Sequence, residues 1–336
     1  MDTTEKFELI KRNTQEIITE EELITLLDEK KNPAAYWGTA PTGRVHIGYF
    51  IPMLKIADFL KAGFKFKILI ADLHAYLDDQ KTPWALLDAR TEYYKEIIKA
   101  MLDSIKVDYK RLNFITGSEF QLGNEYMLDV LRMSAEVTLN RAKRAAAEVV
   151  RFTEEPKVGG FIYPLMQIED VPTLEVDVTY SGVDQRHIYM LGRELLEGLD
   201  HKKPACVFTP MLPGLEGQKM SASETKNKID LLDTTNEVIK KVNSAYCIPG
   251  DLNNSILPFI KYVIFPLKQG ITIERDKKFG GKAPYKDYSK LENDFVNKKL
   301  HPADLKNAVS SEINKLLDPI RKKFKNKQKL IEKAYP

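Results

Sequence analysis

The hydrophobic pattern of the first part of the chain changes in the order strand, turn, helix and strand. A short apolar segment at 34–37 runs into a turn rich in glycine and threonine at 38–43. Apolar residues then recur at helical spacing over 50–60, and a nearly continuous apolar run follows at 66–72. Such a run is typical of a strand buried on both faces. The order predicts a βαβ unit.

The rest of the sequence predicts mainly helices and one further strand. Residues 1–31 predict two charged amphipathic helices, and helical patterns dominate 83–151. A strand is predicted at 175–180, before a glycine turn and another helix. Further helices are predicted at 231–246, 254–265, 288–298 and 302–324. We therefore place a boundary near 229–232, between an α/β domain and a helical domain.

Length and composition agree with this division. A chain of 336 residues suggests two domains, and 43% hydrophobic residues supply a core. The net charge is only +3, but residues 321–336 carry seven basic side chains against one acid. This tail is either a non-specific basic surface for nucleic acid or a solvated helix end. Five scattered histidines and two distant cysteines predict no metal site. No signal peptide or membrane span is evident, so we expect a cytoplasmic protein.

Two motifs carry candidate phosphate chemistry. The first, Gly-Thr-Ala-Pro-Thr-Gly-Arg-Val-His-Ile-Gly-Tyr at 38–49, leads from a strand into a helix, where backbone N–H groups can cradle a phosphate. The alternative is a plain turn whose His46 only caps or packs. The second motif, at 213–223, is a glycine-punctuated loop with one lysine between hydroxyl residues, Lys219-Met-Ser-Ala-Ser. Taken alone, a loop of this kind is more simply interpreted as solvated surface.

Together the two motifs resemble the paired signatures of class I aminoacyl-tRNA synthetases. Segments 36–39, 71–76, 163–170 and 182–186 are similar to those of tyrosyl-tRNA synthetases of the archaeal and eukaryotic cytosolic type, and the resemblance extends from about residue 8 to the end. It implies a Rossmann-like parallel-sheet catalytic domain with a helical insertion, followed by an all-α anticodon-binding domain. The corresponding ranges are 1–31 for an N-terminal helical segment, 32–230 for the catalytic domain with an inserted segment at about 100–155, and 231–336 for the anticodon domain.

The resemblance also implies an activity and its participants. It predicts a tyrosine–tRNA ligase that converts L-tyrosine and ATP, with Mg²⁺, to tyrosyl-adenylate and then charges tRNA(Tyr). It further implies a homodimer joined through the inserted segment. The protein is expected to have no membrane partner.

Site residues follow from the resemblance by position. Catalysis is assigned to His46, Lys219, Thr42 and Ser221. The ATP site is assigned to Gly38, Thr39, Thr42, Gly43, His46, Gly48, Asp184 and Lys219. The tyrosine site is assigned to Tyr36 and Asp170 at the phenol, to Tyr163, Gln167 and Gln185 at the α-amino group, and to His74, which could instead be a core histidine. The first anticodon base is assigned to Phe279, His301 and Asp304, of which Asp304 could instead be a helix cap.

The residues themselves support part of this assignment. Tyr163, Gln167 and Asp170 are four and three residues apart, so a helix places them on one face. The alternative, a solvated polar stripe, is disfavoured because the neighbouring side chains are apolar. Two positions depart from the family: Tyr49 stands where the first motif commonly has His, and Ala222 where the second commonly has Lys. The second departure leaves open whether Arg44, Mg²⁺ or a monovalent cation balances the pyrophosphate charge.

Three other functions remain to be weighed. Tryptophanyl-tRNA synthetases also carry Lys-Met-Ser-Ala-Ser, but Tyr36 with Asp170 argues against them because an indole offers one donor and no acceptor. A catalytically inactive paralogue that only binds RNA or a partner is disfavoured by intact His46, Lys219 and Gln185. Other nucleotidyltransferases share a similar first motif but lack the helical RNA-binding half.

Overall fold

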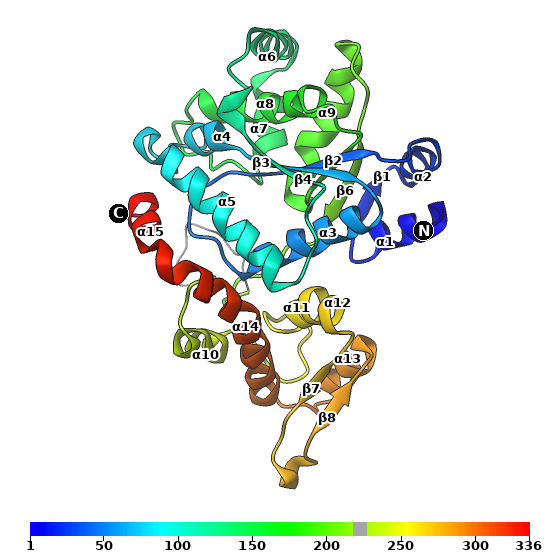
Figure 1. Ribbon diagram of the computed structural model, residues 1–336, viewed down its shortest axis with the longest axis vertical. Coiled ribbons are helices and arrows are strands. Elements are labelled where there is room, and N and C mark those ends of the chain that lie inside the picture. Colours follow the sequence, from blue (N-terminus) through cyan, green and yellow to red (C-terminus); the bar gives the residue numbers. More distant parts are fainter. Residues whose placement is uncertain (218–226) are drawn as a thin grey trace.

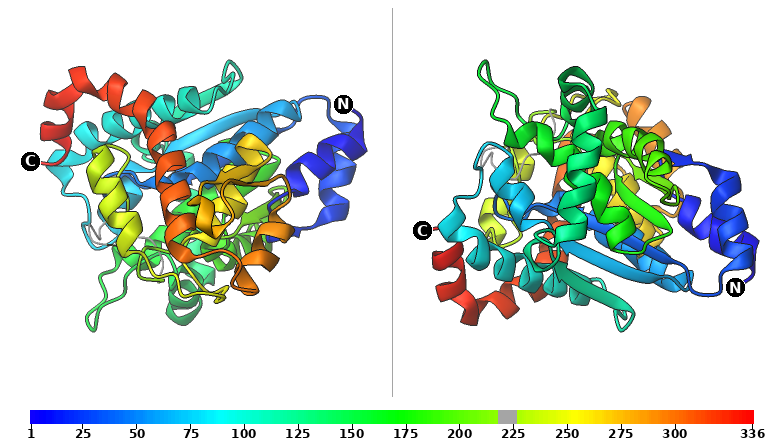
Figure 2. Two further views of the ribbon diagram at one scale, coloured as in Figure 1. Left: turned by 90° about the horizontal axis from the view of Figure 1, so that it is seen from below. Right: turned by 90° about the horizontal axis from the view of Figure 1, so that it is seen from above.

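The computed structural model describes residues 1–217 and 227–336. Its upper part in Figure 1 is a twisted sheet with helices on both faces, and its lower part is mainly helical. The N-terminus lies beside the sheet edge, and the last helix returns from the lower part to the sheet (Figures 1 and 2). None of the helices in these two stretches is long and apolar enough to cross a membrane.

The sheet has six strands in the order β1-β6-β5-β2-β3-β4. The strands are β1 Glu16–Ile18, β2 Ala34–Thr39, β3 Lys65–Ile70, β4 Leu112–Thr116, β5 Val178–Gly182 and β6 Ala205–Thr209. All neighbours run parallel except β1, which pairs antiparallel with β6. Every side chain of β6 is buried, as expected where helices cover both faces of a parallel sheet.

Helices form one layer on each face of the sheet. The first hydrophobic cluster joins the sheet to α1 Thr3–Lys11, α2 Glu20–Glu29, α3 Phe50–Lys61 and α5 Leu87–Ser104. The second joins it to α4 Asp72–Leu77, α6 Asn124–Glu136, α7 Leu139–Ala146, α8 Gly159–Thr173 and α9 Arg186–Gly198. Because both faces are covered, the carboxyl ends of the parallel strands are left as the accessible edge.

The C-terminal region shares the first of these clusters. It contains α10 Thr235–Ser244, α11 Leu257–Phe259, α12 Phe265–Lys268, α13 Tyr288–Val296, α14 Pro302–Phe324 and α15 Gln328–Ala334. Residues of α10 and α14 belong to the same buried cluster as α3 and α5. Apolar contacts therefore continue across the boundary predicted near 229–232, and the division into domains stays a prediction.

The predicted α/β class with a helical C-terminal region is confirmed, and four details are corrected. The C-terminal region is not strictly all-α, because β7 Ile271–Ile273 and β8 Ala283–Tyr285 form an antiparallel hairpin. Strand β1 lies between the two N-terminal helices, and β4 lies within 83–151, where helical patterns dominate. Strand β6 lies at 205–209, where no element was predicted. Strands of three to five residues are too short to establish a two-residue period.

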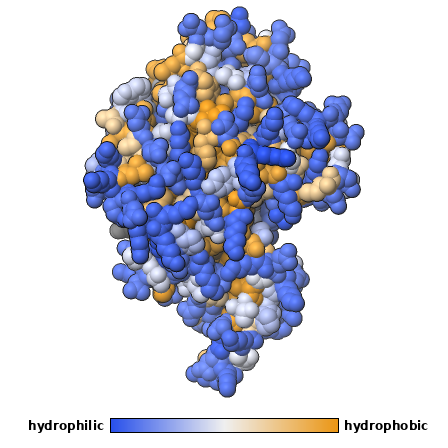
Figure 3. All heavy atoms as spheres, in the orientation of Figure 1, coloured by the Kyte–Doolittle hydropathy of each residue, from blue (hydrophilic) through white to orange (hydrophobic). Residues whose placement is uncertain are grey.

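The basic tail packs against α5. Lys327 Nζ pairs with Glu96 at 2.6 Å, and Lys323 pairs with Asp103. The ring of Phe324 at the end of α14 lies edge-on to Tyr93 at 5.8 Å. Hydrophilic side chains dominate this part of the surface (Figure 3). Lys323 and Lys327 thus fix the C-terminal helices to α5, a role that neither sequence interpretation included.

Candidate active site

A cavity of about 590 Å³ opens where β2, β5 and β6 end. Ligands of open parallel sheets bind at this edge. Thr39, Gly182 and Thr209, the last residues of the three strands, line the cavity. So do twelve of the residues predicted from the sequence: Tyr36, Gly38, Thr39, Thr42, His46, Gly48, His74, Tyr163, Gln167, Asp170, Asp184 and Gln185. The predicted tyrosine and ATP sites thus form one space. Lys219 and Ser221 lie outside the described residues.

The predicted phenol site contains a second tyrosine that the sequence analysis missed. Tyr36 projects from β2, and its hydroxyl lies 2.9 Å from the hydroxyl of Tyr189 on α9. Burial raises the pKa of both phenols, so both stay protonated. Gln167 Nε2 donates to Gln185 Oε1 at 2.7 Å, which joins α8 to the turn before α9. Tyr189 lies four residues after Gln185, and this spacing is the signal that could have identified it.

Asp170 is 1% exposed and is held by two donors from the inserted segment. Gln121 Nε2 and the Tyr126 hydroxyl donate to its Oδ1 at 2.7 and 2.9 Å. Neither bond reaches Oδ2, so this oxygen is left to accept from a ligand in the cavity. Burial raises the pKa of Asp170 to about 7, although the two hydrogen bonds oppose the shift and the nearby Glu169 adds to it. Neither donor was predicted, because no pattern links them to residue 170.

His74 is both buried and part of the cavity wall. It is 1% exposed, and its ring lies edge-on to Tyr163 at 4.5 Å. Burial lowers its pKa to about 4, so the ring is neutral at physiological pH. The two interpretations left open for His74 are therefore compatible: it packs as a core residue and shapes the pocket.

His46 begins the short 3₁₀ helix Ile47–Tyr49 and accepts a hydrogen bond through Nδ1 from the backbone N–H of Gly48 at 3.1 Å. Burial, with a smaller effect of the Lys228 charge, lowers its pKa to about 3. A neutral ring whose Nδ1 accepts must carry its proton on Nε2. His46 therefore caps the turn, as the alternative interpretation held, and still offers one N–H donor beside the cavity.

The backbone carbonyls of the predicted phosphate turn accept hydrogen bonds from side chains elsewhere in the chain. Arg90 Nη1 donates to Thr42 O at 2.6 Å. The hydroxyls of Tyr94 and Tyr335 donate to Gly43 O at 2.7 and 2.8 Å. Gly43, predicted to bind ATP, does not line the cavity, and its carbonyl carries these supports instead. Because the carbonyls bond to α5 and the C-terminal helix, the turn has a fixed conformation.

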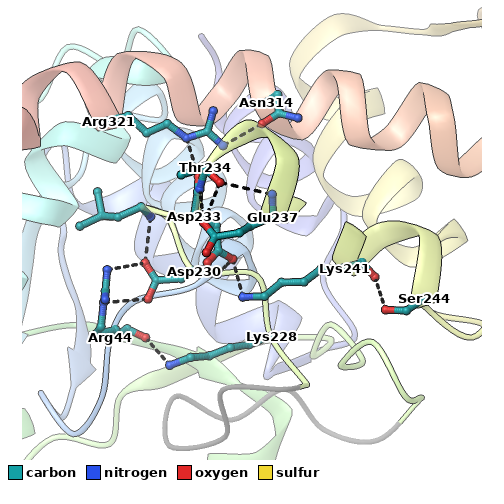
Figure 4. Close-up of polar contacts among 11 residues, drawn as sticks. Arg44, Lys228, Asp230, Asp233, Thr234, Glu237, Lys241, Ser244, Asn314 and Arg321 are labelled. Carbon is teal, nitrogen blue, oxygen red and sulfur yellow. Dashed lines mark hydrogen bonds and ion pairs between the residues drawn. The ribbon is translucent and has the colours of Figure 1, made fainter. Parts of the chain in front are cut away.

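A network of ion pairs joins the first motif to the C-terminal helices (Figure 4). Arg44 Nε lies 3.0 Å from Asp230 Oδ2, and the backbones at 46 and 230 form an antiparallel bridge. The backbone N–H of Asp230 donates to Asp233 Oδ2 at 2.8 Å, and Arg321 of α14 donates to the Asp233 carbonyl at 2.7 Å. Arg44 is thus engaged with Asp230 and does not line the cavity, which weakens it as a substitute for the lysine missing at 222.

Asp184 is positioned by a tight turn at the end of β5. It lies in the 3₁₀ turn Val183–Gln185 and lines the cavity. A Cβ at Gly182 would lie 2.5 Å from Asp184 Oδ1 and 2.4 Å from Met211 Sδ, so a side chain there would force both away. The glycine therefore lets the carboxylate fold against the strand end.

Comparison with known proteins agrees with this geometry. The family of class I tRNA synthetases (W and Y) matches residues 28–318. The tyrosine–tRNA ligase of Haloarcula marismortui is 47% identical over 100% of this chain and 98% of its own length. This chain belongs to the tyrosyl-tRNA synthetases of class I. The cytoplasmic tyrosine–tRNA ligase of Danio rerio is 50% identical over 99% of this chain, which spans 63% of that relative.

Solved structures separate this family from its sister. A tyrosyl-tRNA synthetase of Archaeoglobus fulgidus, complexed with L-tyrosine, superimposes with a TM-score of 0.90 at 44% identity, over 96% of this chain and 99% of its own. A tryptophanyl-tRNA synthetase of Aeropyrum pernix shares the fold, with a TM-score of 0.70 at 18% identity over 94% of this chain and 84% of its own. The resemblance to tyrosyl-tRNA synthetases inferred from the motifs is thus confirmed.

The three predicted anticodon residues lie in the C-terminal region of this synthetase, and their role stays a prediction. Phe279 is 63% exposed and is the last residue of the 3₁₀ turn Lys277–Phe279, within the loop between β7 and β8. His301 is the N-cap of α14, and its Nδ1 accepts from the Ala303 backbone N–H at 3.2 Å. Asp304 lies in the first turn of α14. Because His301 supplies the side-chain cap, the capping alternative loses part of its basis for Asp304.

Proposed function

We propose that the chain is a tyrosine–tRNA ligase, which forms tyrosyl-adenylate from L-tyrosine and ATP and transfers the tyrosyl group to tRNA(Tyr). The observation that carries this proposal is the single cavity that joins Asp170 at one end to the His46 turn at the other. Both substrates of the first step therefore fit side by side.

Recognition of tyrosine follows from the polar groups around Asp170 in the cavity. The phenol O–H donates to the ionised Oδ2 of Asp170, and the Tyr36 hydroxyl, already paired with Tyr189, lies on the same wall. Gln167 and Gln185 present amide oxygens to the α-amino group. Phenylalanine leaves Oδ2 of the buried carboxylate without a donor, and a site built for a hydroxyl rejects an analogue that lacks it, as tyrosyl-tRNA synthetases are known to do.

In the first step the tyrosine carboxylate attacks the ATP α-phosphorus, and pyrophosphate leaves. The protein supplies no nucleophile; it positions the two substrates and stabilises charge on the phosphate oxygens. The neutral His46 donates through Nε2–H, and Thr42 on the fixed turn adds a hydroxyl. Lys219 and Ser221 are assigned to the departing pyrophosphate. In the second step the ribose hydroxyl of the tRNA 3′ end attacks the adenylate carbonyl, and AMP leaves.

Mg²⁺ is proposed to arrive with ATP. The ion prefers oxygen ligands and usually binds through substrate phosphates and one or two carboxylates. Among the described residues, four carboxylates lie in the cavity wall: Asp78, Glu148, Asp170 and Asp184. Asp170 is assigned to the phenol, and we assign the ion to Asp184 because it lies at the end of β5, beside the proposed nucleotide site. The ion would add positive charge along the phosphates.

We further propose a homodimer in the cytoplasm, the compartment named for the relatives of Danio rerio and Saccharomyces cerevisiae. The inserted segment exposes large apolar side chains, and exposed apolar patches mark interfaces. These are Leu122, Leu128, Leu131 and Leu139, between 45% and 70% exposed. A second copy is the partner that the family resemblance implies.

Tyrosine-dependent ATP–pyrophosphate exchange tests the proposal directly. We expect exchange with tyrosine, not with tryptophan or phenylalanine, and charging of tRNA(Tyr). Exchange with tryptophan would indicate the sister activity. Absence of exchange with every amino acid, in a folded protein that binds RNA, would indicate an inactive paralogue.

A further inference from the structure

A carboxylate that the proposed reaction does not use lies buried behind the substrate pocket. Glu169 precedes Asp170 on α8 and is 3% exposed. Its Oε1 accepts from Thr173 Oγ1 at 3.0 Å, while Oε2 is buried without a hydrogen-bond partner among the described residues. Buried polar groups in folded proteins are almost always satisfied. The second oxygen therefore calls for a partner that residues 1–217 and 227–336 do not provide.

Two further ligand-type side chains lie near the Glu169 carboxylate. Asp129 comes from α6, and His201 comes from the segment after α9, so three separate elements converge. His201 Nε2 lies 3.2 Å from Asp129 Oδ2, and ligand atoms of all three residues lie within 4.8 Å of one another. The Asp129 and His201 side chains are 15% and 32% exposed, so an ion has access from solvent.

The donor set selects the kind of ion. We propose that Asp129, Glu169 and His201 form a site for one divalent transition-metal ion of the Zn²⁺ type. One imidazole nitrogen and two carboxylate oxygens suit Zn²⁺ or Co²⁺, whereas Ca²⁺ and Mg²⁺ prefer oxygen alone. The two carboxylates are also oriented by hydrogen bonds: Arg132 lies 3.0 Å from Asp129 Oδ1, and Thr173 donates to Glu169 Oε1. Such hydrogen-bond partners orient the ligands in metal sites. Three protein ligands leave the fourth position to water.

The proposed metal site lies close enough to the substrate pocket to affect the contact between Tyr126 and Asp170. Tyr126 lies three residues before Asp129 on α6, and its hydroxyl donates to Asp170. An ion that joins Asp129 to Glu169 ties α6 to α8 at this point, and so holds Tyr126 against Asp170. This consequence rests on the proposed function, whereas binding of the ion does not. Loss of the ion should therefore raise the KM for tyrosine.

Co²⁺ titration of the chelator-treated full chain tests the site without any activity measurement. We expect one saturable Co²⁺ per chain, with a visible d–d absorption band that Zn²⁺ displaces. His201→Ala and Asp129→Asn should each weaken binding at least tenfold. His187→Ala is the matched control, because His187 lies 3.8 Å from Glu148 in an exposed pair that forms no three-ligand group among the described residues.

The outcomes separate the two parts of the proposal. Absence of saturable Co²⁺ binding, or an unchanged affinity in His201→Ala, overturns the site. A rise in thermal midpoint with Zn²⁺ that disappears in Asp129→Asn supports it, because only the folded chain assembles the three ligands. Metal binding with an unchanged KM for tyrosine overturns the link to the pocket. An enzyme that lacks tyrosine exchange altogether but binds Co²⁺ refutes the proposed function and keeps the site.

Discussion

Replacing Asp170 by alanine should largely abolish the discrimination between tyrosine and phenylalanine. Its effect on the stability of the fold should be smaller. The carboxylate is 1% exposed, and its two bonds, from Gln121 and Tyr126, both end on Oδ1. Oδ2 is therefore the oxygen that distinguishes a phenol from a phenyl ring. The substitution should lower kcat/KM for tyrosine and raise it for phenylalanine, so the ratio of the two values is the informative quantity.

The expected size follows from the contacts. A hydrogen bond to a charged acceptor is worth about 1.5–3 kcal/mol, so kcat/KM for tyrosine should fall roughly 10- to 150-fold. A buried carboxylate oxygen left without a donor beside phenylalanine costs about 1–3 kcal/mol, and its removal should raise kcat/KM for phenylalanine roughly 5- to 150-fold. The ratio should therefore collapse by at least about 50-fold.

Exchange kinetics with both amino acids measure this ratio. Asp170→Asn keeps the shape of the side chain and controls for cavity formation, while Tyr126→Phe removes one donor to Oδ1 and leaves Oδ2 in place. Tyr126→Phe should change the ratio far less than Asp170→Ala. If the ratio stayed the same in Asp170→Ala while the thermal midpoint fell, Asp170 would be a structural residue and the assignment of the phenol site would be wrong.

Four further predictions concern other parts of the site. Lys219→Ala should lower kcat for exchange roughly 100-fold with little change in KM for tyrosine, because the lost charge acts on the departing pyrophosphate; a change confined to KM for tyrosine contradicts this. Because the phenol needs an ionised acceptor, kcat/KM for tyrosine should rise with pH, level off above about 7, and lose this inflection in Asp170→Asn. Tyr335→Phe removes the bond to Gly43 and should raise KM for ATP several-fold while KM for tyrosine stays constant; equal changes in both refute a local effect. Asp304→Ala should weaken charging of tRNA with guanine at the first anticodon position and spare exchange; equal losses would make Asp304 a structural residue.

The parts of the site that the sequence predicted are those in which spacing alone implies proximity. Tyr163, Gln167 and Asp170 lie on one helix face, and the residues of 38–48 follow one strand end, so a helical or strand period brings them to the same cavity. Gln121 and Tyr126, the hydrogen-bond donors to Asp170, come from another part of the chain. Only tertiary packing brings these donors to Asp170, and no local pattern encodes it.

The short strands were missed for a related reason. Strand β4 was not distinguished from the surrounding helical stretch because its five residues, Leu112–Thr116, comprise three partly buried positions, one exposed and one buried, without clear alternation. The hairpin strands Ile271–Ile273 and Ala283–Tyr285 have three residues each. Pairing with a neighbour, and not the residues' own pattern, makes these segments strands.

The support of the phosphate turn shows how far such non-local contacts determine chemistry. A turn that binds phosphate must present N–H groups to the ligand, and its carbonyls then need hydrogen-bond donors on the opposite side. Arg90 donates to the Thr42 carbonyl. Tyr94 and Tyr335 both donate to the Gly43 carbonyl, although Tyr335 lies 292 residues further along the chain. Arg90 Nε also donates to Ala334 O at 3.0 Å, so the last helix and the turn meet on one guanidinium. The motif supplies the glycines and threonines of the predicted phosphate turn, but contacts with the C-terminus support its conformation. The return of α14 and α15 to α5 therefore belongs to the proposed phosphate site.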